Sequence, residues 1–330
     1  MPAPLRLGLL GCGDIAARRT LPALARTPGA ALAAVAARDP ARAAAFAARF
    51  GGERAASYEG LLARPDVDAV YVCLPTMLHA HWAERALEAG KHVLVEKPLA
   101  TNGADARRLF ALAGRRGLVL LENFMFLHHA TQRTVAGLLG TGVLGTLRAV
   151  SAAFTIPPRP DGDTRYDPAL GGGALLDNGV YPLRAALRLL GTDLTVAGAV
   201  LRHDGRRGVD LSGSALLTAP DGATAQVRWG MEHHYRSWYE VQGSAGTLSV
   251  EHVYTTAPDH SPVVLLRTGT QTREIHVPAE DHFEAVLAFF AAAVASPAPA
   301  RPGLPLLDAE SRRQAGLLDE VRGAAVCVSV

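Results

Sequence analysis

The chain has few cysteines, no long apolar run and no excess of charge of either sign. Only 3 of its 330 residues are cysteine, irregularly spaced, which suggests neither a disulfide scaffold nor a zinc site. No segment approaches the roughly 20 uninterrupted apolar residues that span a bilayer, and the N-terminal apolar run is too short for a signal peptide. A net charge of +2 with scattered arginines gives no reason to expect nucleic acid or a membrane as partner. We therefore expect a cytoplasmic location.

The first part of the chain alternates short apolar segments with helix-like ones. The segments "LRLGLL", "AALAAVAARD", "VDAVYVCLP", "HVLVEKP" and "LVLLENF" are typical of buried strands, and helices of about a dozen residues separate most of them. This alternation predicts an α/β fold with a doubly wound parallel sheet. We expect this sheet to form a dinucleotide-binding Rossmann domain over residues 1–123.

After Phe126 the pattern changes to longer strand-like segments joined by tight turns. "APDGAT" and "GSAG" are typical of turns between neighbouring strands, which predicts an open, largely antiparallel sheet. Helices are expected near "DHFEAVLAFFAAAVA" and "LDAESRRQAGLLDEVRGA", with "SPAPARPG" as a Pro-rich connector between them. The sequence thus predicts a C-terminal α+β domain over residues 124–330, whose last helix can pack back on the first domain.

The first apolar segment runs directly into a glycine-rich loop. In "LRLGLLGCGDIAARR", Gly11, Gly13 and Ala16 have the spacing G-x-G-x-x-A between a strand and a helix. The first glycine permits a tight turn, the second lets the backbone approach a pyrophosphate, and the small third residue allows close helix–strand packing. A glycine-rich turn that binds nothing is the alternative. The context predicts a dinucleotide site made by Gly11, Cys12, Gly13, Asp14, Ile15 and Ala16.

The end of the second strand bears on which dinucleotide binds. NAD-binding proteins usually place Asp or Glu there to bond the ribose hydroxyls, but this chain has Ala37 followed by Arg38. Arg38 presents donors suited to a 2′-phosphate, and Arg42 lies one helical turn later. We therefore predict NADP (NADPH) as cofactor. Two alternatives stay open: Asp39 as the carboxylate of an NAD site, and Arg38 as a solvated surface arginine.

Two further motifs carry a family resemblance. "GKHVLVEKPLA" places Lys97 at the end of a strand, the edge where doubly wound sheets bind ligands, and "GGGALLDNGVYPL" lies in the second part. With the glycine loop, these motifs resemble the Gfo/Idh/MocA oxidoreductases over essentially the whole chain. Within that family, "ENFMFLHH" and "YEVQGSAGTLSVE" are similar to the NDP-hexose 3-ketoreductases of deoxysugar biosynthesis. The resemblance implies a C-terminal domain that binds substrate and forms a homo-oligomer, a dimer or tetramer, through its sheet.

The resemblance also implies a reaction: NADPH-dependent reduction of the C3 ketone of a dTDP-linked keto-deoxyhexose. Such a reduction needs positive charge or a proton at the carbonyl oxygen. The resemblance makes Lys97 the group that polarises this oxygen. Tyr181 stands where many family members have histidine, and a neighbouring cation would help its phenol to donate the proton. Asp177, on the same helix face if this stretch is helical, is expected to orient the pair; a buried Tyr181 satisfied by Asp177 is the alternative.

Other residues at strand ends complete the predicted sites. Thr76 and His79 are expected to line the cofactor crevice, and Asn123 to contact nicotinamide or substrate. Arg165 is expected to meet the nucleotide diphosphate, with a solvated loop arginine as the alternative. The predicted cofactor contacts beyond the glycine loop are Ala37, Arg38, Arg42, Leu74, Pro75, Thr76, Leu78, His79, Glu96, Lys97, Pro98 and Asn123. The predicted substrate contacts are Lys97, Phe126, Arg165, Asp177 and Tyr181.

No metal site is expected, and two other functions stay open. The adjacent His128 and His129 cannot readily chelate one ion, and no cysteine or carboxylate cluster completes a site. "EHVYTT" replaces an Arg-Ala-Phe run that the subgroup often has, which leaves the exact sugar open. One alternative function is an NAD(P)-dependent dehydrogenase of a free sugar or inositol. The other is a non-catalytic sugar sensor, against which the presence of both Lys97 and Tyr181 argues.

Overall fold

The computed structural model of the protein describes residues 4–297 and 300–330. Residues 1–3 of the predicted first domain and residues 298–299 of the Pro-rich connector lie outside the described residues. Contacts along the chain separate two compact units. The first takes in residues up to Ala100, Ala104–Met125 and Phe283–Ser311, and the second takes in Thr101–Gly103, Phe126–His282 and Arg312–Val330.

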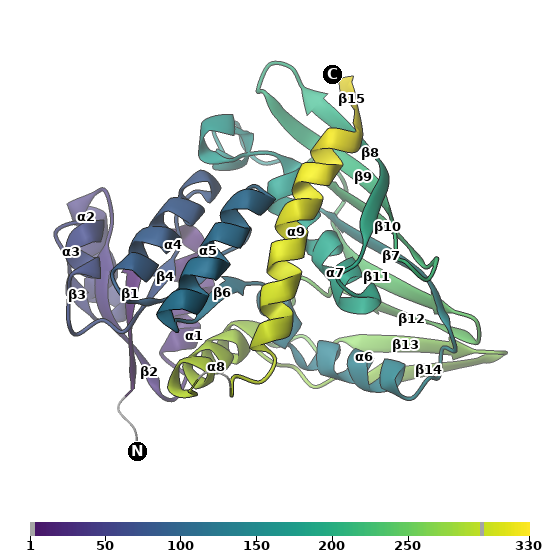
Figure 1. Ribbon diagram of the computed structural model, residues 1–330, viewed down its shortest axis with the longest axis horizontal. Helices are drawn as coiled ribbons and strands as arrows, with labels where there is room; N and C mark the ends of the chain where they lie inside the picture. The colour runs from purple at the N-terminus through teal and green to yellow at the C-terminus, as the bar shows by residue number, and fades with distance from the viewer. Residues whose placement is uncertain (1–3, 298–299) are drawn as a thin grey trace. The chain divides into compact units, whose positions relative to one another are not determined.

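The first unit contains a six-stranded sheet in which all neighbouring strands are parallel (Figure 1). The strand order is β3-β2-β1-β4-β5-β6, the order of dinucleotide-binding folds, in which ligands lie at the carboxyl ends of the strands. The predicted doubly wound sheet is confirmed. The strands are β1 (Leu5–Leu10), β2 (Ala30–Ala36), β3 (Glu53–Arg54), β4 (Ala69–Val72), β5 (His92–Glu96) and β6 (Leu120–Asn123).

Helices connect consecutive strands of this sheet, and α3 (Tyr58–Leu62) lies outside the prediction. Asp39 caps α2, which begins at a proline and ends before a left-handed glycine, Gly51. Pro favours a first helical turn because the amide it lacks has no partner there. The connecting elements are η1 (Ala16–Thr20), α1 (Leu21–Leu24), α2 (Pro40–Phe50), α3 (Tyr58–Leu62), η2 (Thr76–Leu78), α4 (His79–Glu88) and α5 (Gly103–Arg116). Two further helical elements, η3 (Met125–His128) and α8 (His282–Ala295), follow β6 and β14.

The second unit contains a nine-stranded sheet of order β14-β13-β12-β11-β7-β10-β9-β8-β15. Neighbours are antiparallel except β7 with β10 and β8 with β15, so the prediction of a largely antiparallel sheet is confirmed. The strands are β7 (Leu147–Thr155), β8 (Thr195–Asp204), β9 (Val209–Thr218), β10 (Thr224–Gly230), β11 (Arg236–Gly243), β12 (Gly246–Glu251), β13 (Val263–Thr268), β14 (Gln271–His276) and β15 (Ala325–Ser329).

Helix α7 (Val180–Leu190) packs against β7 and β10 on one face of this sheet. Side chains of β10 alternate between this buried face and solvent, as a half-buried strand requires. The remaining elements are α6 (Ala130–Gly140), η4 (Thr164–Tyr166), η5 (Pro168–Leu170), η6 (Leu175–Gly179) and α9 (Leu304–Ala324). In the described part of the chain, no helix has the length and apolar character needed to cross a membrane.

An ion pair ties the start of β1 to the residue before β4. The Arg6 guanidinium donates hydrogen bonds of 2.9 and 2.6 Å to the two carboxylate oxygens of Asp68, and the Arg6 amide donates another of 2.9 Å. Hydrogen bonding from Arg6 holds the pKa of Asp68 below its usual range. A carboxylate with a lowered pKa in the folded state stabilises the fold above its unfolded pKa of about 3.9, and this contribution is lost as the pH falls below it.

We therefore expect Asp68→Asn to lower the free energy of unfolding by about 1 kcal/mol at neutral pH, since the pair is partly exposed. The difference between variant and parent should shrink as the pH falls through about 4. Urea unfolding at several pH values measures both quantities. A difference that stays constant down to pH 3 would contradict the role assigned to the pair.

Candidate active site

The glycine-rich loop follows β1 and rests on the residues that follow β4. Gly11 has a φ of +93°, and a Cβ there would lie 2.4 Å from the Cys73 carbonyl oxygen. A Cβ on Gly13 would lie 2.6 Å from the Cys73 sulfur, so this glycine is needed for packing as well as for any approach of a ligand. Ala16 is fully buried at the start of η1. The strand–loop–helix context required for a dinucleotide site is therefore present.

Two cysteines in this region are held as neutral thiols. Burial raises the pKa of Cys12 to about 11, against the opposing effect of Arg42, and raises the pKa of Cys73 to about 12. Thiolates are the reactive form of cysteine, so both behave as small apolar groups at neutral pH. Cys12 fills space within the loop, and Cys73 fills space against it.

The residues after β2 bear on whether the cofactor is NADP or NAD. The Asp39 carboxylate accepts a 2.9 Å hydrogen bond from the Ala41 amide and so caps α2. The side chains of Arg38 and Arg42 are exposed, and within residues 4–297 and 300–330 neither forms an ion pair. The Asp39 carboxylate is already bonded to the helix, whereas the two guanidinium groups are exposed. This arrangement fits the 2′-phosphate of NADP better than the two free ribose hydroxyls of NAD.

A buried carboxylate lies directly before Lys97. Glu96, the last residue of β5, accepts hydrogen bonds on one oxygen from the Tyr71 hydroxyl (2.5 Å) and the Asn123 amide (2.6 Å). Asn123 pairs with Glu96 in register at the end of β6, and the Thr20 hydroxyl lies 3.1 Å from that of Tyr71. This network anchors the end of β5 and leaves Lys97, half-buried, in the turn that follows.

The Lys97–Pro98 peptide bond is cis. The next amide, that of Leu99, donates a 2.8 Å hydrogen bond to the Glu122 carboxylate. His79 is buried, and its ring nitrogens lie 2.8 Å from the Pro98 carbonyl oxygen and 2.7 Å from that of Leu74. Both ring nitrogens therefore face backbone carbonyl oxygens, so neither is open to a ligand. Half-buried positions around this turn are Leu74, Pro75, Thr76 and Leu78.

In the second unit, the structure brings Arg165 and Asp177 together. The Arg165 Nε donates a 2.6 Å hydrogen bond to Asp177, and one terminal nitrogen donates a 3.1 Å bond to Asp163. Asp177, first among several causes, raises the pKa of Arg165 above its ordinary value. The guanidinium is thus shared by two carboxylates, and Asp177 is held in one orientation.

The glycine run of "GGGALLDNGVYPL" makes this arrangement possible. The Gly173 amide donates a 2.9 Å hydrogen bond to the Arg165 carbonyl, and a Cβ on Gly172 would lie 2.6 Å from that oxygen. Gly173 has a φ of +111°, and a Cβ there would meet the Asp210 carboxylate. The Leu175 amide donates to the same carboxylate at 2.7 Å. These contacts fix the start of the helical segment that carries Asp177.

Tyr181 lies in an aromatic cluster of the second unit. The residue is 3% exposed, and its ring centroid lies 4.9 Å from that of Phe154, 5.5 Å from Tyr254 and 6.0 Å from Phe126. A π-helical segment, Leu175–Gly179, runs directly into α7, and Gly179 keeps helical dihedral angles. Asp177 and Tyr181 therefore lie on consecutive turns of one helix.

Several residues of these networks lie outside the sequence prediction. Tyr71, Glu122 and Asp163 hold predicted residues in place, and Phe154 and Tyr254 enclose Tyr181. A polar residue inside the apolar run "VDAVYVCLP" is the one sequence signal that marks Tyr71. The other contacts join residues distant in sequence, and no local pattern indicates them.

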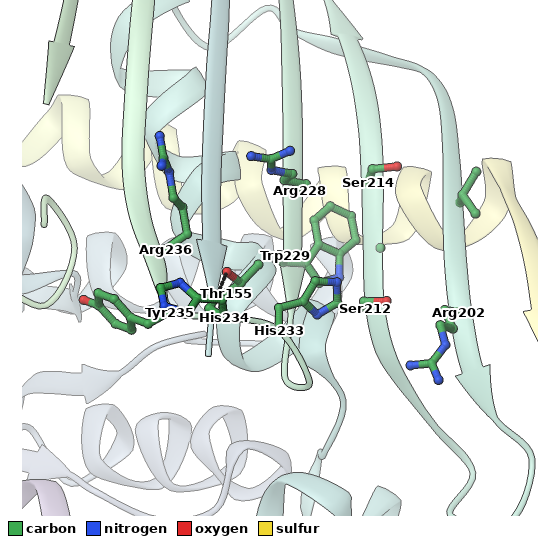
Figure 2. Close-up of a pocket in the computed structure, with 12 residues that line it drawn as sticks. Thr155, Arg202, Ser212, Ser214, Arg228, Trp229, His233, His234, Tyr235 and Arg236 are labelled. Carbon is green, nitrogen blue, oxygen red and sulfur yellow. Dashed lines mark hydrogen bonds between the residues drawn. The ribbon is translucent and has the colours of Figure 1, made fainter. Parts of the chain in front are cut away.

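A further pocket of about 510 Å³ lies on the sheet of the second unit, and none of the predicted site residues lines it (Figure 2). Two of its arginines are paired: Arg202 with Glu232 at 2.9 Å and Arg236 with Glu251 at 3.0 Å. The labelled lining residues include Arg202, Ser212, Ser214, Arg228, His233, His234 and Arg236.

In the part of the chain described here, no group of three histidine, cysteine or carboxylate side chains could hold a metal ion.

Comparison with known proteins gives a consistent result along the chain. Residues 5–124 match a model described as "Oxidoreductase family, NAD-binding Rossmann fold", and residues 132–249 match the "GFO/IDH/MocA C-terminal domain". A dTDP-3,4-didehydro-2,6-dideoxy-alpha-D-glucose 3-reductase of Actinomadura kijaniata is 51% identical, over 98% of this chain and 96% of its own. A Streptomyces antibioticus protein of the same name is 50% identical, over 98% of both chains.

Among solved structures, that of KijD10, a 3-ketoreductase from Actinomadura kijaniata in complex with NADP and TDP-benzene, is similar with a TM-score of 0.94. It is 50% identical and covers 99% of both chains. Structures of KijD10 variants have also been solved, in which a tyrosine is replaced by phenylalanine, or a lysine by alanine or by glutamate.

The capping role of Asp39 can be separated from any role in ligand binding. Asp39→Ala should lower the free energy of unfolding by about 1 kcal/mol because α2 loses its N-cap. Arg38→Ala, at the exposed neighbouring position, should change it by less than about 0.5 kcal/mol. Denaturant unfolding without ligand measures both. Equal losses of unfolding free energy in Asp39→Ala and Arg38→Ala would show that Asp39 does not stabilise α2 more than its neighbour does.

Proposed function

Because the chain belongs to the Gfo/Idh/MocA family of oxidoreductases, we propose that it is an NADPH-dependent reductase of the C3 ketone of a dTDP-linked keto-deoxyhexose. The observation that carries this proposal is identity of about 50% over nearly the full length to proteins named dTDP-3,4-didehydro-2,6-dideoxy-alpha-D-glucose 3-reductase. KijD10 binds NADP and TDP-benzene, which supports both the cofactor and a nucleotide-linked substrate.

The residues of the first unit fit a bound NADP. The glycine-rich loop would hold the pyrophosphate through backbone amides, and Arg38 and Arg42 would hold the 2′-phosphate. When bound, NADPH supplies the hydride for the ketone carbon. The turn at Lys97 lies at the carboxyl edge of the sheet, where such folds bind their ligands. The ammonium group of Lys97 polarises the ketone oxygen and so favours negative charge on it.

The residues of the second unit supply the proton. The Tyr181 hydroxyl donates its proton to the developing alkoxide, and the cluster of Phe126, Phe154 and Tyr254 holds the ring in one orientation. Asp177, fixed by Arg165, orients the sugar beside it. Lysine and tyrosine are also the residue types replaced in the KijD10 variants, which supports the choice of these two groups.

We further propose a cytoplasmic homo-oligomer assembled through the sheet of the second unit. Val200, Leu216 and Val326 are between 41 and 66% exposed, and Val326 pairs with Val200 on the neighbouring strand. Large apolar side chains gathered on one surface favour association with a partner. The three cysteines are free thiols, which suits a reducing compartment.

The proposed activity is tested by following the loss of NADPH absorbance with a dTDP-3,4-diketo-2,6-dideoxyhexose generated in situ. We expect rapid oxidation of NADPH with this substrate and no reaction with free glucose or inositol. Oxidation of NADH should be slower, because NADH lacks the 2′-phosphate that Arg38 and Arg42 would bind. NAD reduction by a free polyol, with no turnover of the nucleotide sugar, would instead support the sugar dehydrogenase. Binding of both ligands without turnover in either direction would support the sensor.

Two substitutions test the proposed roles in the reaction. Lys97→Ala and Tyr181→Phe should each lower kcat by about 10²- to 10⁴-fold, the range for loss of a general acid or an electrostatic contact. The dissociation constant for NADPH, measured by fluorescence titration, should change by less than about threefold in the tyrosine variant. Tyr235→Phe, which removes a hydroxyl bonded to Thr255, is the matched control. Ketone reduction at the parent rate in either site variant would remove that residue from the mechanism.

A further inference from the structure

His79 connects the two chain segments that border the predicted cofactor edge of the first unit. It is the first residue of α4, is 2% exposed, and lies between the end of β4 and the turn after β5. Its Nδ1 is 2.8 Å from the Pro98 carbonyl oxygen, and its Nε2 is 2.7 Å from the Leu74 carbonyl oxygen. A single ring therefore contacts both segments through backbone oxygens.

The Leu74 side of this contact leads to the glycine-rich loop. A Cβ on Gly11 would lie 2.6 Å from the Leu74 side chain and 2.4 Å from the Cys73 carbonyl oxygen. Gly11 thus lies directly against Cys73 and Leu74, and His79 contacts the backbone of Leu74. Any movement of Cys73 and Leu74 moves the surface that supports the loop.

The Pro98 side leads to Lys97, because the Pro98 carbonyl belongs to the residue after the lysine. Lys97 extends from a turn fixed on one side by Glu96 and on the other by the Leu99 amide bond to Glu122. The contact with His79 adds a third anchor, and it is the one that reaches the glycine-rich loop. We propose that His79 is a positioning residue that sets Lys97 relative to this loop through the Pro98 carbonyl.

The chemistry of the ring decides which contact matters. Neutral imidazole has one N–H, so it donates to only one of two carbonyl oxygens, whereas the imidazolium donates to both. Burial lowers the pKa of His79 below its ordinary value; the two carbonyls and Glu96 oppose this effect, and Lys97 adds to it. A neutral ring donates one hydrogen bond, and the role proposed for His79 requires that this bond run from Nδ1 to the Pro98 carbonyl oxygen, 2.8 Å away.

Two conservative variants separate the two contacts. The amide nitrogen of asparagine is as many bonds from Cβ as Nδ1, so His79→Asn keeps a donor for Pro98. The amide nitrogen of glutamine is as far along its side chain as Nε2, so His79→Gln keeps a donor for Leu74 only. His81→Gln, the same change at an exposed position of α4, is the matched control.

The inference rests on the proposed reductase function, in which Lys97 contacts the ketone. We expect His79→Gln to lower kcat about 10- to 100-fold, because small displacements of a catalytic group have effects of this size, while KM for NADPH changes by less than about threefold. His79→Asn should retain at least about tenfold more kcat than His79→Gln. His81→Gln should match the parent enzyme, and thermal melting checks that each variant folds.

Equal kcat values for the asparagine and glutamine variants, with an active parent, would overturn the inference and leave the proposed function intact. An inactive parent would count against the proposed function itself. If the variants do not fold, nitrogen NMR of the parent's His79 ring decides. A proton on Nδ1 supports the assignment, and a neutral ring protonated only at Nε2 overturns it.

Discussion

The contact between the Gly11 backbone and the Cys73 carbonyl determines how the carboxyl edge of the parallel sheet is built. With a left-handed glycine and no Cβ, the loop after β1 lies directly on the residues after β4. Those residues in turn support His79, and His79 reaches the turn that contains Lys97. The elements that would hold a cofactor and the lysine that would act on a ketone therefore share one continuous set of contacts through Cys73, Leu74 and His79. Stiffness of this kind favours catalysis because little reorganisation is left for the moment of reaction.

The second unit reaches a similar rigidity by different means. Gly172 and Gly173 lie beside carbonyl and carboxylate oxygens of the same unit, so they serve local packing rather than the approach of a ligand. Gly179 lies against the Trp229 ring, where a Cβ would approach to 2.9 Å. Charged pairing fixes Asp177, and aromatic packing fixes Tyr181. One helix therefore presents two polar groups whose orientations are set by unrelated interactions.

Local patterns in the sequence predict much of the fold, because short apolar strands, glycine loops and helix ends are encoded by adjacent residues. The same reasoning identifies Lys97, Asp177 and Tyr181 as candidates, through motifs and family resemblance. It does not indicate the link from Arg165 to Asp177, the carbonyl contacts of His79, or the bond from Tyr71 to Glu96. Each of these joins residues at least 5 positions apart whose distance depends on the folded chain. Strand β15 is absent from the prediction as well, because five residues after a 21-residue helix give too short a pattern.

The π-helical segment Leu175–Gly179 has a consequence for how this site can vary among related chains. A π-helical turn holds about one residue more than an α-helical turn, and it is equivalent to a single insertion into a regular helix. Deleting one residue there would rotate everything before it by about 100° relative to Tyr181. Asp177 would then leave the direction in which Arg165 holds it, and a neighbour would take its place. A one-residue change in length is thus enough to exchange the side chain beside the tyrosine while α7 itself keeps its packing on the sheet.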